Sequence, residues 1–282
     1  PEIGIGNKPI DDGNYLFTPE EKAEFLRLEP AAKPFFRPWT GADEFINGYT
    51  RWCLWLGDCP PEQLRRMPLA MERVQAVRAF RLASKSKPTN LLAQTPTRFH
   101  VENMPKGKFL VIPGVSSERR RYIPMGFLTP RYLASNLLNV VPKATLFDFG
   151  VLTSFMHMSW MRHVAGRLES RYRYSAKLVY NNFPWPKDIS PKQKAAVEAA
   201  AADVLQVRKQ YPNASLADLY DPHAMPGALL KAHTKLDRAV DRCYRSQPFS
   251  NDVDRMAYLF ALYEAHTAPL SKPSPRRAKQ GE

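Results

Sequence analysis

The sequence predicts an α+β protein in which a mixed α/β part is followed by an all-helical part. Up to Pro186, short apolar runs are separated by Pro and Gly residues, as in strands that alternate with helices. After Pro186 the chain becomes alanine-rich, and its apolar residues recur at helical spacing. We therefore expect a mixed domain over residues 1–186, a helical domain over residues 187–270 and a disordered tail over residues 271–282.

The first expected helix begins at Thr18, a preferred N-cap residue that is followed by Pro19 at the first helical position. It should end near Leu28, because Pro30 follows. Residues 1–19 ahead of it are expected to be irregular, since turn-forming Gly, Pro, Asp and Asn residues dominate there.

Seven aromatic residues lie between Phe35 and Trp55, with Arg37 and Arg51 among them. Arginines next to aromatic rings can stack on nucleic-acid bases, or they can belong to a packed core in which they form ion pairs. We favour the core, because Arg51–Leu56 is typical of a buried strand.

Pro60-Pro61 should start a helix that Pro68 interrupts or restarts. From Leu69 to Ala83 the apolar residues fall near helical spacing, which leaves three arginines on the expected exposed side: Arg73, Arg78 and Arg81. Ser84–Arg98 is expected to be a basic, polar loop. Such a loop either lies along a phosphate backbone or is a flexible connection.

Short strands are expected over three ranges that Pro or Gly residues separate: Lys108–Val115, Arg121–Phe127 and Ala144–Phe147. One helix should run from Phe147 to Gly166, followed by a strand over Arg171–Tyr180. In the second part we expect a long helix from Ser190-Pro191 to about Tyr211, a helical turn and two further helices: Ser215–Tyr220, Pro226–Tyr244 and Asn251–Thr267.

Positive charge is concentrated in one stretch of the chain. Arg65–Arg131 contains fourteen Lys or Arg residues and three acidic residues, a net charge of +11, whereas the whole chain carries +14. A local surplus of this size predicts a surface that binds nucleic-acid phosphates. The alternative is a solvated basic face without a partner.

Within this stretch, Ser116–Arg121 combines hydroxyls, a carboxylate and three guanidinium groups, which are the groups that read base edges as well as phosphates. We expect Arg119, Arg120 and Arg121 to contact guanine or phosphate, and Glu118 to accept from a cytosine amino group. The hydroxyls of Ser116 and Ser117 can contact either bases or phosphates. Candidates for backbone phosphates are the remaining basic residues around this segment: Lys85, Lys87, Arg98, Lys106 and Lys108. Because neighbouring side chains point opposite ways in a strand, Arg120 is expected to differ in role from Arg119 and Arg121.

No catalytic, cofactor-binding or metal site is expected in this chain. Gly4-Ile5-Gly6 lacks the strand and helix that frame a phosphate-binding glycine loop. His157 and His163 are six residues apart, so they diverge around a helix and cannot share a metal. Asn181–Pro186 resembles the Asn-Pro-Pro-aromatic motif of amino-group DNA methyltransferases, but it lacks consecutive prolines, so we assign it a structural role.

The composition indicates a folded protein without a membrane-spanning segment. No apolar run approaches the ~18–20 residues that a membrane helix needs, and no signal peptide is recognisable. Three cysteines, an odd number, favour buried thiols in a reducing compartment, and we expect a cytoplasmic protein. Because the chain starts with Pro1 instead of Met, we expect it to be part of a longer protein.

Several strings of residues resemble the carboxy-terminal half of MmeI-like enzymes, which are single-chain adenine-specific DNA methyltransferases, several of them fused to a nuclease. The strings cover almost the whole chain: Gly6–Gly13, Glu44–Gly48, Arg51–Leu56, Ser116–Gly126, Met156–Met158, Gly166–Ser175, Tyr180–Pro186, Leu236–Asp241 and Leu259–Glu264. The resemblance implies a target-recognition domain followed by a helical domain.

It also implies a function for the longer enzyme, namely methyl transfer from S-adenosylmethionine to adenine N6 in a short DNA sequence, with the adenine flipped out of the duplex. The cofactor-binding and catalytic motifs would lie upstream of Pro1, so this chain alone should be inactive and bind no cofactor. Its partners would be double-stranded DNA and the upstream methyltransferase domain. Two alternatives remain: a stand-alone specificity subunit that docks onto a separate methyltransferase, and an RNA-binding protein that exposes aromatic residues such as Tyr122 and Tyr172.

Overall fold

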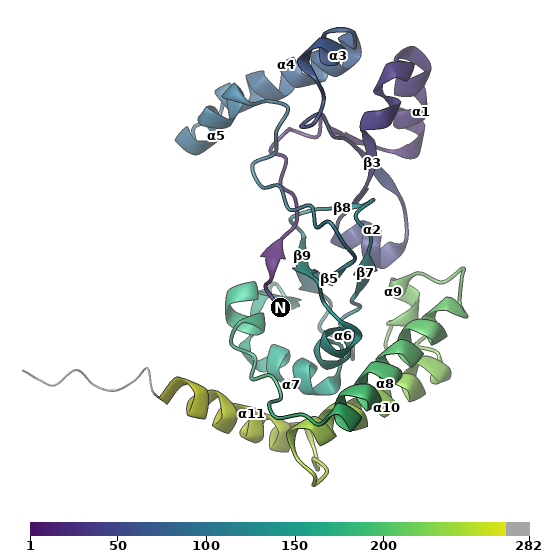
Figure 1. Cartoon of the computed structure of the whole chain (residues 1–282), viewed down its shortest axis with the longest axis vertical. Coiled ribbons are helices and arrows are strands. Elements are labelled where there is room, and N and C mark those ends of the chain that lie inside the picture. Colours follow the sequence, from purple (N-terminus) through teal and green to yellow (C-terminus); the bar gives the residue numbers. More distant parts are fainter. Residues whose placement is uncertain (269–282) are drawn as a thin grey trace, which may run out of the picture.

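The computed structural model describes residues 1–268, and the tail expected at residues 271–282 lies outside this range. The molecule is elongated, with α1, α3, α4 and α5 at one end and α7, α8, α10 and α11 at the other (Figure 1). Sheets occupy the middle, so the α+β class is confirmed, with mixed structure first and helices last. No helix within residues 1–268 is long and apolar enough to cross a membrane.

The N-terminal lobe is built on a sheet of four strands in the order β2 (Leu16–Phe17), β4 (Arg51–Leu54), β3 (Phe36–Thr40) and β8 (Leu133–Ala134). Helix α1 (Pro19–Leu28) packs beside it and confirms the predicted helix, since Thr18 and Glu21 form the reciprocal bonds of a capping box. The buried strand predicted at Arg51–Leu56 is also confirmed, because Cys53, Leu54 and Leu56 are fully or almost fully buried.

Helices α3 (Pro61–Arg65) and α4 (Pro68–Leu82) confirm the restart predicted at Pro68. The loop predicted at Ser84–Arg98 is wrong, because it contains α5 (Lys87–Leu91) and the 3₁₀-helix η2 (Leu92–Gln94). The Asn90 amide holds α5 against the end of α4. It donates to the carbonyls of Arg81, Leu82 and Ser84 at the end of α4, at 2.7–3.1 Å.

The exposed position predicted for Arg81 is also wrong, because its side chain is fully buried. It lies four residues after Val77 and seven after Val74, and therefore on the buried face of α4. Its guanidinium donates to five backbone carbonyls at 2.8–3.1 Å: those of Pro9, Ile10, Leu92, Thr95 and Arg98. Arg81 thus joins the N-terminal segment to the chain that follows α5.

A second sheet crosses the middle of the molecule in the order β1 (Gly4–Ile5), β9 (Leu138–Pro142), β5 (Phe109–Pro113) and β7 (Gly126–Leu128). Three predictions are wrong here. Residues 1–19 are not wholly irregular, since they contain β1 and β2. Arg121–Phe127 is a strand only at its end, and Ala144–Phe147 contains no strand, because β9 ends at Pro142 and a helix begins at Leu146. Strand β1 depends on pairing with β9, more than a hundred residues further along the chain, which local patterns do not report.

The single helix predicted over Phe147–Gly166 is two helices, α6 (Leu146–Leu152) and α7 (Phe155–Val164). The break follows from tertiary contacts, since the first backbone N–H of α7, that of Phe155, donates to the Asp237 carboxylate at 2.7 Å. Gly166 then begins the hairpin of β10 (Gly166–Leu168) and β11 (Arg171–Arg173), and β11 pairs with β6 (Val115–Ser116). The strand predicted over Arg171–Tyr180 therefore stops at Arg173 and gives way to the short π-helix η3 (Ala176–Tyr180).

The helical part consists of α8 (Pro191–Lys209), α9 (Leu216–Leu219), α10 (Gly227–Tyr244) and α11 (Asp252–Thr267), which confirms the predicted helices. Within residues 1–268 it has no core of its own. Leu110 of β5, Met156 of α7 and Leu236 of α10 belong to one buried cluster. The core is therefore continuous across Pro186–Lys187, and a division into two domains at that point remains a prediction.

Candidate nucleic-acid interface

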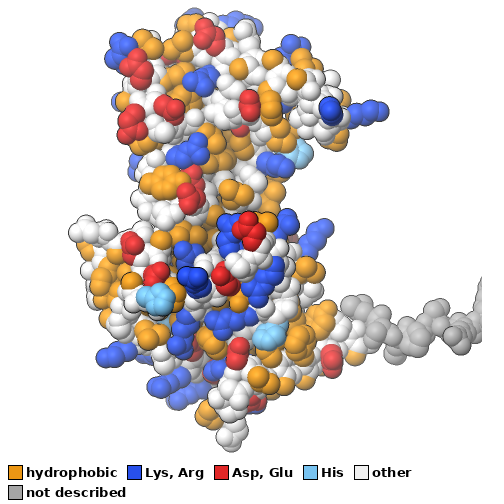
Figure 2. All heavy atoms as spheres, turned by 180° about the vertical axis from the view of Figure 1, so that it is seen from behind, with side chains coloured by type: hydrophobic (Ala, Val, Ile, Leu, Met, Phe, Trp, Pro, Cys, Tyr) orange, Lys and Arg blue, Asp and Glu red, His pale blue; other side chains and the backbone are white. Residues whose placement is uncertain are grey.

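The residues predicted to contact nucleic acid lie in both lobes. Lys85, two residues before α5, and Lys87, its first residue, are exposed at the far end of the N-terminal lobe (Figure 1). Ser116–Arg121 runs from the last residue of β6 toward β7 in the other lobe. Seen from behind, Lys and Arg side chains gather over this second lobe, with acidic side chains among them (Figure 2). The fold thus separates the two lysines from the segment that carries the three arginines.

Arg98, Lys106 and Lys108 lie between these two groups in the chain. The Arg98 guanidinium donates to the Gly57 carbonyl at 3.0 Å and lies 3.0 Å from the Glu102 carboxylate. Its donors are therefore largely engaged in holding the N-terminal lobe together. Lys106 is exposed, and the Lys108 ammonium lies 4.3 Å from the centre of the Phe127 ring, a cation–π contact that leaves its charge at the surface.

Ser116–Arg121 leaves the end of β6 as a turn. The Ser117 hydroxyl accepts from the Arg119 backbone N–H at 3.3 Å, and the Ser117 carbonyl accepts from that of Arg120. The turn leaves Arg119 and Arg121 exposed and Arg120 half-buried. Burial lowers the pKa of Arg120, with the charge of Asp221 acting in the opposite direction. The three arginines thus have different surroundings, although the cause is a turn and not the alternation of a strand.

Arg120 lines a groove of about 630 Å³ between α2 (Ala42–Asn47), the end of β9, β6 and β11. Guanidinium, hydroxyl, amide and carboxylate groups meet in its walls: Arg120, Arg171, Arg173, Ser116, Ser117, Asn47, Asn136, Asn139 and Asp43. The Ser116 hydroxyl is buried and has no hydrogen-bond partner in the described part of the chain. This groove supplies both donors and acceptors to a polar ligand.

The hairpin of β10 and β11 contributes groups that sequence reasoning did not single out. Arg171 and Arg173 are exposed, whereas Tyr172 between them is buried and pairs with Ser116 of β6. Glu169, in the tight turn with a φ of 56°, lies 2.8 Å from the Arg171 guanidinium. The alternation of Arg171, Tyr172 and Arg173 was the available signal, because it places both arginines on one face of a strand.

Other residues that the sequence analysis singled out are packed inside the protein. His157 is buried, its Nε2 lies 2.9 Å from the Tyr174 hydroxyl, and burial lowers its pKa to about 3. Phe183, within the Asn181–Pro186 segment, packs edge-on against His157 at 4.6 Å between ring centres. Tyr122 and Tyr172 are buried and form no exposed aromatic platform. Within residues 1–268, no group of three His, Cys, Asp or Glu side chains is placed to hold a metal ion.

Comparison with known proteins identifies relatives of this chain. DNA methyltransferase A of Bacillus subtilis (strain 168) is 41% identical over 267 residues, which cover 95% of this chain and 30% of that protein. A solved structure of the Type IIL restriction-modification enzyme MmeI in complex with DNA is 49% identical, with a TM-score of 0.93, over 95% of this chain and 36% of that one. The chain thus spans about a third of the length of these relatives.

Two family models match the chain. Residues 1–187 match the model for the MmeI target recognition domain, and residues 189–271 match the model for the MmeI C-terminal domain. The resemblance inferred from the motifs is confirmed. This chain belongs to the MmeI family.

Proposed function

We propose that this chain selects the DNA site for a longer methyltransferase of the restriction-modification type, of which it is a part. The observation that carries the proposal is the groove between α2, β9, β6 and β11, where guanidinium and carboxylate groups meet beside the exposed Arg119 and Arg121. Mixed donors and acceptors on one surface suit base edges, whereas a purely basic surface suits only phosphates. The names of the relatives, a DNA methyltransferase and a restriction-modification enzyme bound to DNA, support the same reaction class.

In the longer enzyme, a methyl group would pass from S-adenosylmethionine to the N6 atom of an adenine flipped out of the duplex. This chain would hold the duplex while the catalytic part acts. Arg119, Arg120 and Arg121 would contact guanine or phosphate, together with Arg171 and Arg173, which line the same groove as Arg120. Lys85, Lys87, Lys106 and Lys108 would contact backbone phosphates outside the groove.

The cofactor would bind in the catalytic part of the longer protein. We expect this chain alone to transfer no methyl group and to bind no S-adenosylmethionine, since Asn181–Pro186 contributes a buried phenylalanine to the core and lacks the consecutive prolines of the catalytic motif. Saturable binding of S-adenosylmethionine in a calorimetric titration would contradict this expectation. We place the enzyme in the cytoplasm, where a reducing environment maintains free thiols such as those of Cys53, Cys59 and Cys243.

The proposal is tested by measuring duplex DNA binding of the 282-residue chain by fluorescence anisotropy at several salt concentrations. If about six phosphates are neutralised, the affinity should fall roughly a thousandfold between 50 and 200 mM salt. Selection from a randomised duplex library should enrich a short sequence. A chain that binds no duplex at low salt, or that enriches no sequence, would contradict the proposal.

A further inference from the structure

The segment that carries the three arginines is held in place by the C-terminal helices. Directly after Arg121, the ring of Tyr122 is fully buried, and its hydroxyl donates to the Asp237 carboxylate of α10 at 2.6 Å. Three residues later, the Met125 carbonyl accepts from the Arg208 guanidinium of α8 at 2.5 Å. The chain between the arginines and β7 is therefore fixed at two points by residues more than eighty positions away.

These two anchors belong to one buried polar network. The ring of Tyr122 stacks on His233, with 4.1 Å between ring centres and 18° between the planes. The Nε2 atom of His233 lies 2.8 Å from the Tyr220 hydroxyl, which accepts from Arg208 Nε at 2.7 Å. Burial is the main cause that lowers the pKa of His233, so the imidazole is neutral and stacks without the cost of a buried charge.

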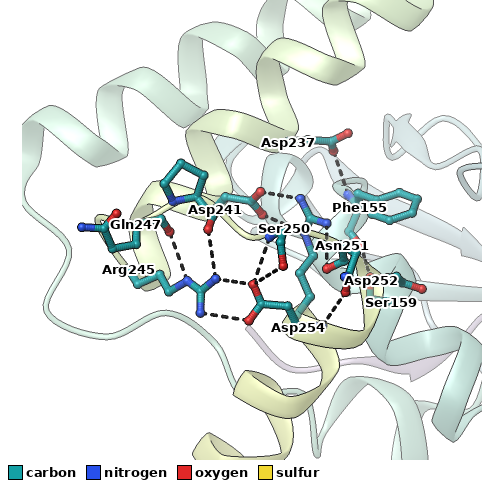
Figure 3. Close-up of polar contacts among 12 residues, drawn as sticks. Phe155, Ser159, Asp237, Asp241, Arg245, Gln247, Ser250, Asn251, Asp252 and Asp254 are labelled. Carbon is teal, nitrogen blue, oxygen red and sulfur yellow. Dashed lines mark hydrogen bonds and ion pairs between the residues drawn. The ribbon is translucent and has the colours of Figure 1, made fainter.

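Asp237 also fixes the platform on which Arg121 lies. Its other carboxylate oxygen accepts from the Phe155 backbone N–H, which orients the start of α7 (Figure 3). The Arg121 guanidinium lies 5.5 Å from the centre of the Phe155 ring, and Arg162 of α7 donates to the Arg121 carbonyl at 3.2 Å. One carboxylate therefore holds both the residue after Arg121 and the ring beneath its side chain.

We infer that Arg208, Tyr220, His233 and Asp237 are positioning residues for DNA selection, an inference that rests on the proposed function. None of the four lines the groove that Arg120 shares with Arg171 and Arg173. They act through Tyr122 and Met125, which set where Arg119–Arg121 lie relative to that groove. Base edges are discriminated by donors held in a fixed geometry, so loss of an anchor alters which sequence is preferred as well as how tightly it binds.

The test compares two tyrosines whose rings are both fully buried. Tyr122→Phe removes only the hydroxyl that donates to the Asp237 carboxylate. Tyr15→Phe, in the other lobe, removes only the hydroxyl that donates to the Pro96 carbonyl at 2.8 Å. Each variant loses one hydrogen bond of a fully buried tyrosine, and the loss at the Asp237 carboxylate should lower the midpoint of thermal unfolding somewhat more than the loss at the Pro96 carbonyl. A merely structural role for Tyr122 would change this midpoint alone, without selective opening of the Arg119–Arg121 segment and without a change of DNA preference.

The first measurement needs no DNA. Native full-length chain is treated briefly with trypsin, and cleavage after Arg119, Arg120 and Arg121 is quantified by mass spectrometry. Loss of the anchor should open this segment more often and accelerate cleavage about fivefold in Tyr122→Phe, with no change in Tyr15→Phe. Equal cleavage rates in the two variants would overturn the inference, because the hydroxyl would then not hold the segment.

The second measurement selects duplexes from a randomised library with wild type and with both variants. Tyr122→Phe should shift the enriched sequence or flatten the preference at one or more positions, whereas Tyr15→Phe should keep the wild-type preference. If Tyr122→Phe is cleaved faster and still enriches the wild-type sequence, the network is an anchor without influence on selection, and the inference is wrong. A wild-type chain that binds no duplex would instead overturn the proposed function, and the inference with it.

Discussion

Arg81 offers the sharpest test of how the N-terminal lobe is stabilised. It is fully buried and has no carboxylate within hydrogen-bond distance in the described residues, yet its guanidinium satisfies five carbonyls of two separate segments. The perturbation is Arg81→Met, which keeps much of the apolar stem and removes all five donors.

The loss of stability can be worked out from these contacts. Each buried carbonyl left without a donor costs about 1–3 kcal/mol. Water entering the vacated space would satisfy some of the five, and the desolvation cost of the charge is recovered. We therefore expect the free energy of unfolding to fall by roughly 4 kcal/mol, a large part of the ~5–15 kcal/mol typical of a domain. Arg81→Lys should lose nearly as much, because a lysine has three donors on one atom and cannot span the five carbonyls.

The measurement is urea unfolding followed by tryptophan fluorescence, with Arg78→Met as the control. Arg78 lies one turn earlier on the same helix, is exposed, and forms no side-chain hydrogen bond or ion pair in the described structure. Its replacement should change the free energy of unfolding by less than about 0.5 kcal/mol. If Arg81→Met lies within about 1 kcal/mol of Arg78→Met, the carbonyl network does not stabilise the fold and the reasoning is refuted.

Three further predictions concern the second lobe and the DNA surface. Gly150→Ala would put a Cβ 2.7 Å from Val197 Cγ1, so it should lower the free energy of unfolding by about 1–3 kcal/mol. Gly227→Ala, which has open space around it, should not lower it, and thermal unfolding of both variants checks this. Burial raises the pKa of Asp237 to about 6, above the 3.8 of a free carboxyl, so the folded state binds more protons between these values. Stability should therefore fall by roughly 2–3 kcal/mol as the pH rises from 4 to 7, and Asp237→Asn should remove that slope in urea unfolding measured across this range. Lys85→Ala should weaken binding about equally for all duplexes, whereas Arg119→Ala should change the preference at one base pair and cost about 1–3 kcal/mol on the selected site. Arg120→Ala should differ in kind from Arg119→Ala, and unchanged preference in every arginine variant would mean that this segment only binds phosphates.

Elements with a local signature could be predicted from the sequence. The capping box at Thr18 and the serine and proline that begin α8 specify where these helices start. The apolar spacing of α10 and α11 specifies that they are helices, because a helix closes its hydrogen bonds within a few residues of the chain. The motif strings likewise identified the family, and with it the order of a mixed part and a helical part.

What local patterns missed depends on partners far away in the chain. Strand β1 consists of two residues that pair with β9, and the break between α6 and α7 is stabilised by Asp237. Arg81 was expected at the surface because the apolar spacing of Leu69–Ala83 predicted an exposed position for it with Arg73 and Arg78, and only hydrogen bonds to five distant carbonyls make its burial favourable.

For the candidate site, too, some features follow from the sequence and others from the tertiary structure. The sequence by itself determined the family, the helices with strong caps, and the basic segment around Arg119–Arg121. Only the tertiary structure decided that Arg120, Arg171 and Arg173 line one groove, and that Lys85 and Lys87 lie in the other lobe. The physical reason is that caps and apolar spacing act within a few residues, whereas a groove exists only where β6, β11 and α2 have been brought together by a core that spans the chain.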